Sequence, residues 1–114
     1  RRREPGNDWI IIKLAKKAII KEIEIDTAHF KGNFPDKASI QAASVSEVVS
    51  SNENIIKDSE KWDLILDQTK LKADNVHKFS LDLNPQKEAT HIRLNIYPDG
   101  GVSRLRIFGI ILND

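Results

Sequence analysis

The sequence Thr-His-Ile-Arg-Leu-Asn-Ile-Tyr, residues 90–97, decides the fold class, because apolar and polar side chains alternate in it without interruption. Successive side chains of a β-strand point to opposite faces, so this stretch would carry an apolar and a polar face. The apolar face consists of Ile92, Leu94 and Ile96, and the polar face of His91, Arg93, Asn95 and Tyr97. The pattern predicts a strand with one face against a core.

Shorter stretches with the same alternation occur along the chain, at residues 9–14, 22–26, 38–42, 62–66, 78–83 and 104–107. Turn-forming clusters rich in Gly, Pro, Asn and Asp separate several of them, at residues 5–8, 31–36, 84–85 and 97–101. Strands at this spacing without long helical patterns predict an all-β fold, an antiparallel sandwich. Residues 44–61 are polar; Val45, Val48 and Val49 allow a short helical turn, but we expect a surface excursion.

Composition limits the classes of protein that the chain can represent. Its 114 residues fit one domain, residues 1–114. The 18 basic and 17 acidic residues are interspersed, which argues against a nucleic-acid partner held by a basic stripe. No apolar run is long enough to span a membrane, and the lack of Cys excludes disulfides and thiolate metal sites. The chain contains no Met, so we expect it to be a piece of a longer polypeptide.

The segment from Asp26 to Pro35 places acid, imidazole, amine and amide groups directly after a strand end. Loops on a rigid sheet often carry binding and catalytic groups. In the functional interpretation, Asp26 or His29 is an acid/base and Asn33 a hydrogen-bond partner for a substrate. The alternative makes Gly32 and Asn33 turn formers and the two phenylalanines loop anchors.

The segment from Tyr97 to Arg104 contains Asp99-Gly100-Gly101. Asp-Gly is a strong hairpin signal, and this favours a turn in which Asp99 accepts backbone amides. Glycines also allow a ligand to approach the backbone closely, so a functional role for Asp99 stays open.

Arginine side chains on outer strand faces could bind the carboxylate of a small organic acid. The candidates are Arg93, Arg104 and Arg106. Cross-strand ion pairs with outward carboxylates would satisfy the same arginines; those carboxylates belong to Glu22, Glu24 and Asp26. The three histidines have no metal-ligand spacing, so no metal and no cofactor is expected.

Short motifs found along most of the chain together have the order and spacing of one family. They are Arg1–Arg3, PGNDWIIIKL at 5–14, EIDT at 24–27, HFKGNFP at 29–35, SIQAA at 39–43, TKLKAD at 69–74, THIRLNIYPDGG at 90–101 and SRLR at 103–106. This set resembles the allantoicase family. The resemblance implies a jelly-roll β-sandwich of the galactose-binding-like type, and a longer chain that contains two such repeats.

The resemblance also implies an enzyme that converts allantoate and water into ureidoglycolate and urea. Residue chemistry then suggests Asp26, His29 and Asp99 for proton transfer, and Arg93 or Arg104 for the substrate carboxylate, with Asn33 on a ureido group. The alternative function is a non-catalytic ligand-binding or assembly module on the same sandwich. Expected partners are allantoate, a sister repeat and further copies of the protein, without nucleic acid or membrane. The expected location is intracellular, cytoplasmic or peroxisomal.

Overall fold

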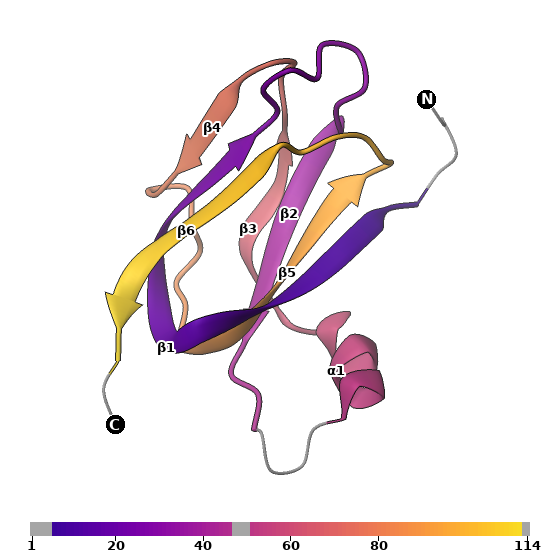
Figure 1. Ribbon diagram of the computed structural model, residues 1–114. Coiled ribbons are helices and arrows are strands. Elements are labelled where there is room, and N and C mark those ends of the chain that lie inside the picture. Colours follow the sequence, from indigo (N-terminus) through magenta and orange to yellow (C-terminus); the bar gives the residue numbers. More distant parts are fainter. Residues whose placement is uncertain (1–5, 47–50, 113–114) are drawn as a thin grey trace.

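The computed structural model describes residues 6–46 and 51–112, which form six strands and one helix (Figure 1). The elements are β1 (Asp8–Asp26), β2 (Lys37–Ala43), α1 (Asn52–Ser59), β3 (Asp63–Lys70), β4 (Val76–Phe79), β5 (Ala89–Tyr97) and β6 (Arg104–Ile111). All strand pairs are antiparallel. No helix among the described residues is long and apolar enough to cross a membrane.

The strands form two packed layers because β1 curls from one layer into the other. Its first part, from Asp8, pairs with β5, and this layer continues through β2 to β3. Its last part, up to Asp26, lies between β4 and β6. Register shifts after Lys13 and after Ile20 accompany this curl, as expected for β-bulges. The predicted antiparallel jelly-roll β-sandwich is confirmed.

The core lies between the layers and is built from the apolar faces that the alternation predicts. From β5 it includes Ile92 and Leu94, and from β1 it includes Ile23 and Ile25. All four side chains are at most 6% exposed. Burial of such a continuous apolar interior is the main favourable term in folding.

Four sequence expectations need correction. The predicted strands at 9–14 and 22–26 are one continuous strand, β1. The expected surface excursion contains α1, whose N-terminus is capped by the Ser51 hydroxyl, which accepts from the Asn54 N–H. Residues 47–50, with two of the valines considered for a helical turn, lie outside the described residues.

The other two corrections concern strand faces and ends. The strand expected at 78–83 ends at Phe79, because a turn closed by the Leu83 N–H and the Ser80 carbonyl follows it. Leu81 is therefore 99% exposed. In β3 a bulge interrupts the alternation, so Ile65 and Leu66 are both buried whereas Leu64 is exposed.

Candidate functional site

Three loops meet at one end of the sandwich, because β1, β3 and β5 end there and β2, β4 and β6 begin there. The loops comprise residues 27–36, 71–75 and 98–103, at the top of Figure 1. Backbone hydrogen bonds connect them: the Gly101 N–H donates to Asn33 over 2.7 Å, and the Leu71 N–H to Asp36 over 3.0 Å. The two predicted segments, 26–35 and 97–104, therefore lie at the same end.

Asp26 is the last residue of β1 and joins two of these loops. Its carbonyl oxygen accepts the Ser103 N–H at 2.8 Å and the Ser103 hydroxyl at 3.0 Å. Its carboxylate Oδ1 accepts the Ala28 N–H at 2.7 Å, as in a turn closed by an aspartate side chain. Oδ2 accepts no hydrogen bond from the described residues. One oxygen thus orients the carboxylate and the other is available for chemistry.

His29 and Asn33 present their side chains to solvent on the 27–36 loop. His29 has a φ of 73°, a left-handed conformation that is uncommon for residues other than glycine. Its backbone N–H donates to the carboxylate of Asp74 over 2.8 Å, which ties the 27–36 loop to the 71–75 loop. This hydrogen bond fixes the backbone that carries the His29 imidazole.

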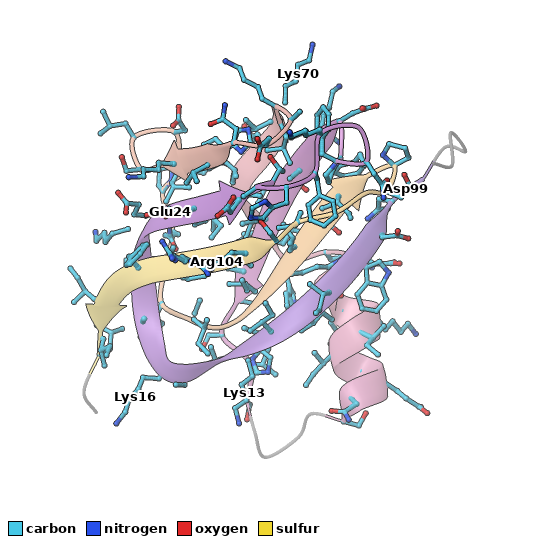
Figure 2. All side chains as sticks on the ribbon, turned by 45° about the horizontal axis from the view of Figure 1, so that its top comes forward. Lys13, Lys16, Glu24, Lys70, Asp99 and Arg104 are labelled. Carbon is cyan, nitrogen blue, oxygen red and sulfur yellow. The ribbon has the colours of Figure 1, made fainter. Side chains whose placement is uncertain are left out.

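Asp99 is buried in the 98–103 loop, after a cis peptide bond between Tyr97 and Pro98. Figure 2 shows it near the end of β5 and the start of β1. The next two residues are glycines in close packing: a Cβ on Gly100 would lie 2.5 Å from the Phe34 carbonyl carbon, and a Cβ on Gly101 would overlap the Phe30 ring unless that ring moved. The glycines therefore serve close packing of the two loops as well as the turn.

One of the predicted cross-strand ion pairs forms on the outer face of the β6–β1–β4 layer. Arg106 lies opposite Glu24 in the strand register and forms an ion pair with it over 3.4 Å. Arg104 lies opposite Asp26, two register positions nearer the loop end, and is exposed. No ion pair joins Arg104 to an acidic group among the described residues. Arg104 and Asp26 are therefore neighbours at the loop end.

Arg93 lies on the outer face of the other layer, because β5 and β6 are in different layers. Both arginines alternate with core residues, so Arg93 and Arg104 are on opposite outer faces and the structure does not bring them together. Arg93 is also only 6% exposed, contrary to a solvated outer face. Helix α1 and Trp9 cover it, and neither contact follows from strand alternation.

Around Arg93 the polar face of β5 forms a hydrogen-bond network with β2 and the end of α1. The Arg93 Nε donates to the Asn95 Oδ1 at 2.8 Å, and its Nη1 donates to the Ser59 hydroxyl at 2.7 Å. The Asn95 amide donates to Gln41 at 3.0 Å and to Ser39 at 3.3 Å. The Ser39 and Tyr97 hydroxyls are 3.0 Å apart. Apart from Ser59, the residues of this network line a hollow of about 320 Å³.

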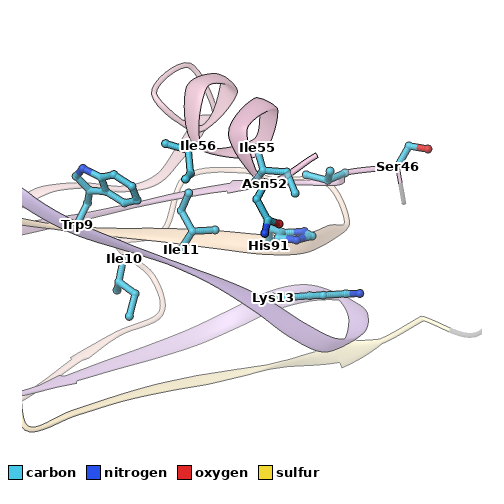
Figure 3. A pocket seen from close by; sticks show the side chains of 10 residues that line it. Trp9, Ile10, Ile11, Lys13, Ser46, Asn52, Ile55, Ile56 and His91 are labelled. Carbon is cyan, nitrogen blue, oxygen red and sulfur yellow. The ribbon is translucent and has the colours of Figure 1, made fainter. Parts of the chain in front are cut away.

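A second hollow, of about 660 Å³, lies between α1 and the same outer face (Figure 3). His91 lies at its floor, Trp9 and Ile11 come from β1, and Ile55 and Ile56 from α1. The His91 Nδ1 is 2.8 Å from the Thr90 hydroxyl. Its walls are largely apolar, so it differs in character from the hollow at Arg93.

His77 has a structural role. Its Nε2 accepts the Lys72 N–H at 2.8 Å, so Nδ1 carries the proton and donates to the Ile25 carbonyl at 2.9 Å. Across residues 6–46 and 51–112, no group of three or more His, Asp or Glu side chains could hold a metal ion.

The structure thus divides the predicted site residues into two groups. Asp26, His29, Asn33, Asp99 and Arg104 belong to the loop end, whereas Arg93 belongs to the opposite outer face. Sequence reasoning missed the residues that surround Arg93, namely Trp9, Ser39, Gln41, Ser59 and Glu60. The alternation in β2 predicts that Ser39 and Gln41 share one face of that strand. No sequence pattern predicts that α1 contacts Arg93.

This architecture places the chain in the class of antiparallel jelly-roll β-sandwich domains. Comparison with known proteins is more specific, since the family model for the allantoicase repeat matches residues 1–112. The chain belongs to the allantoicase repeat family.

Its curated relatives include a probable allantoicase 1 of Burkholderia mallei, 50% identical over 111 residues, which span 97% of this chain and 32% of that protein. A probable allantoicase of Rhizobium meliloti is 51% identical over 111 residues, 96% of this chain and 33% of that protein. The crystal structure of allantoicase from Saccharomyces cerevisiae superimposes with a TM-score of 0.74 at 30% identity, over 96% of this chain and 30% of that one. The chain spans about a third of the length of the relatives it matches.

Proposed function

We propose that this chain is one repeat of an enzyme that hydrolyses allantoate to ureidoglycolate and urea, a step of purine degradation. The observation that carries the proposal is the match of nearly the whole chain to the allantoicase repeat, together with about 50% identity to proteins named probable allantoicase. The common placement of the predicted loop residues at one end of the sandwich supports it.

The reaction sets the groups that the protein must supply. One carbon of allantoate carries a carboxylate and two ureido nitrogens, and one of its C–N bonds breaks. The departing nitrogen takes a proton and leaves with its carbonyl as urea, while water delivers a hydroxyl to the carbon and its remaining proton to a base. An acid/base group, a carboxylate-binding cation and hydrogen bonds to the ureido groups are therefore needed.

In the proposed site, Asp26, His29 and Asp99 are the candidates for proton transfer. The unengaged Oδ2 of Asp26 and the exposed imidazole of His29 support this role for the 27–36 loop. Asn33 would hold a ureido group, and Arg104 would bind the carboxylate, because Arg104 lies opposite Asp26 at this end whereas Arg93 lies on the opposite outer face. None of these roles is assigned to a cofactor or a metal.

The chain would act within a longer protein. We propose that residues 1–114 are one of two repeats, that the sister repeat contributes to the active protein, and that the protein forms a homo-oligomer in the cytoplasm or the peroxisome. Coverage of about a third of each relative supports the further repeat. No nucleic-acid or membrane partner is part of the proposal.

Urea release from allantoate by the intact protein tests the proposal. We expect wild type to produce urea, and His29→Ala or Asp26→Ala to lower kcat by ~10²–10⁴-fold, as for loss of a general acid or base. Lys31→Ala is the matched control, because Lys31 is exposed on the same loop and has no proposed role. Near-normal turnover in both variants would remove the loop from catalysis, and no urea from wild type would reject the function.

A further inference from the structure

Arg93 is a buried cation whose charge is not balanced by a carboxylate. Its side chain is 6% exposed, and its hydrogen bonds from Nε and Nη1 go to the uncharged Asn95 and Ser59. Within residues 6–46 and 51–112, no acidic side chain forms an ion pair with it. Burial of an unpaired charge is costly, so buried arginines are normally paired. An anionic partner from outside the chain would supply the missing charge.

The surroundings hold this guanidinium in one orientation. Trp9 lies over it, with its ring centroid 4.6 Å from the guanidinium carbon, in cation–π geometry. The Nη2 group makes no hydrogen bond to the described residues, so both of its N–H donors can bind a ligand. A planar guanidinium held in this way is suited to carboxylate recognition.

The hollow beside Arg93 also contains acceptors for amide hydrogens. Glu60 is its acidic residue and is exposed, and the hydroxyls of Ser39 and Tyr97 lie on the strands below. A ureido group is rich in N–H donors, which a carboxylate such as that of Glu60 accepts. Carboxylate and ureido group occur together in the substrate and in the product of the proposed reaction.

We propose that the hollow between Arg93 and Glu60 binds a small ureido-bearing carboxylate, with the ligand carboxylate on Arg93 and its ureido N–H groups on Glu60. This inference rests on the proposed function and places a second ligand site on the outer face that carries Arg93, apart from the loop-end residues Asp26, His29 and Arg104. It also adds Trp9 and Glu60 to the residues that determine affinity, as the groups that orient the cation and accept the ureido hydrogens.

Binding of ureidoglycolate to the intact protein, measured by calorimetry, tests the assignment. Arg93→Gln and Asn95→Asp should each weaken binding more than 10-fold, the second because it places an internal carboxylate beside the Arg93 Nε. Arg106→Gln is the control of the same residue type, since Arg106 lies on the opposite outer face and pairs with Glu24. Its affinity should equal that of wild type. Loss of binding in Arg104→Gln with normal binding in Arg93→Gln would overturn the assignment.

Glu60→Ala, at the residue that follows α1, provides a readout that does not disturb the buried network. Glu53→Ala, at an exposed residue in the first turn of α1, is its control. Glu60→Ala should weaken the binding of ureidoglycolate severalfold. The binding of glycolate, which lacks the ureido group, should stay unchanged. Glu53→Ala should change neither. If Arg93→Gln and Asn95→Asp fail to fold, unchanged ureidoglycolate affinity in Glu60→Ala overturns the proposal.

Failure of this inference is separable from failure of the proposed function. Urea production by wild type with unchanged ureidoglycolate binding in the variants rejects the hollow alone. Absence of urea from wild type rejects the function.

Discussion

The guanidinium carbon of Arg93 lies 4.6 Å from the centroid of the Trp9 ring, where β1 and β5 pair at the edge of their layer. Trp9 remains 43% exposed although it shields a side chain that is only 6% exposed. The indole therefore acts as a cover over the cation, with one face on Arg93 and much of the ring in solvent.

Removing this cover in Trp9→Ala should weaken ureidoglycolate binding by about 2- to 30-fold, the range that a cation–π contact of ~0.5–2 kcal/mol allows. Trp9→Phe retains an aromatic face and should recover most of the affinity. Calorimetry on the intact protein measures both values. Equal affinity in the alanine variant and wild type would show that Trp9 does not orient Arg93 for a ligand.

Gly100→Ala should destabilise the protein by about 1–3 kcal/mol, because the new methyl group would overlap the Phe34 backbone and φ is +126°. Gly32→Ala is the matched control on the facing loop, where nothing lies within 4 Å of a Cβ. Urea denaturation measures the free energy of unfolding of both. A neutral Gly100→Ala would mean that the two loops are not packed against each other as described.

Ile25→Ala should lower the free energy of unfolding by about 2–5 kcal/mol, because its side chain is fully buried between the layers. Leu81→Ala should have an effect near zero, since Leu81 is 99% exposed beyond the end of β4. A large loss of stability in Leu81→Ala would instead support the strand through residue 83 that alternation predicts.

The Arg106–Glu24 pair should contribute little to stability. The Arg106 side chain is 48% exposed whereas that of Glu24 is 11% exposed, so solvent screens the pair from the arginine side, and we expect a coupling of about 0–1 kcal/mol, as for exposed pairs. A double-mutant cycle with Arg106→Gln and Glu24→Gln isolates this coupling from the effects of each substitution. A coupling well above this range would indicate a strongly desolvated pair and would disqualify Arg106→Gln as an inert control.

Strand alternation was sufficient to predict the sandwich. The inner faces of β1, β5 and β6 contain the predicted core residues, such as Ile25, Ile92 and Leu105. Alternation reports which residues share a face of a strand, and in a two-layer fold the apolar face is the inner one. It does not report where a strand bends or ends, so the curl of β1 and the end of β4 at Phe79 were not predictable from it.

The candidate site was predictable where topology alone brings residues together. Antiparallel strands place their connecting loops at common ends, so the 27–36 and 98–103 loops meet. The environment of Arg93 depends on α1, an eight-residue helix of low apolar content in a polar segment. Short helices of this kind are stabilised by tertiary packing and carry little local signal. The Ser59–Arg93 contact therefore had no counterpart in the sequence pattern.

The most direct test of the account follows the carbon atoms of the substrate. Allantoate labelled with ¹³C in both ureido carbonyls is incubated with the intact protein and observed by NMR. Hydrolysis of one C–N bond predicts that one labelled carbonyl appears in urea for each that remains in ureidoglycolate. Allantoate that stays unchanged at high protein concentration, or labelled carbon that leaves in any form other than urea, would contradict the proposed function.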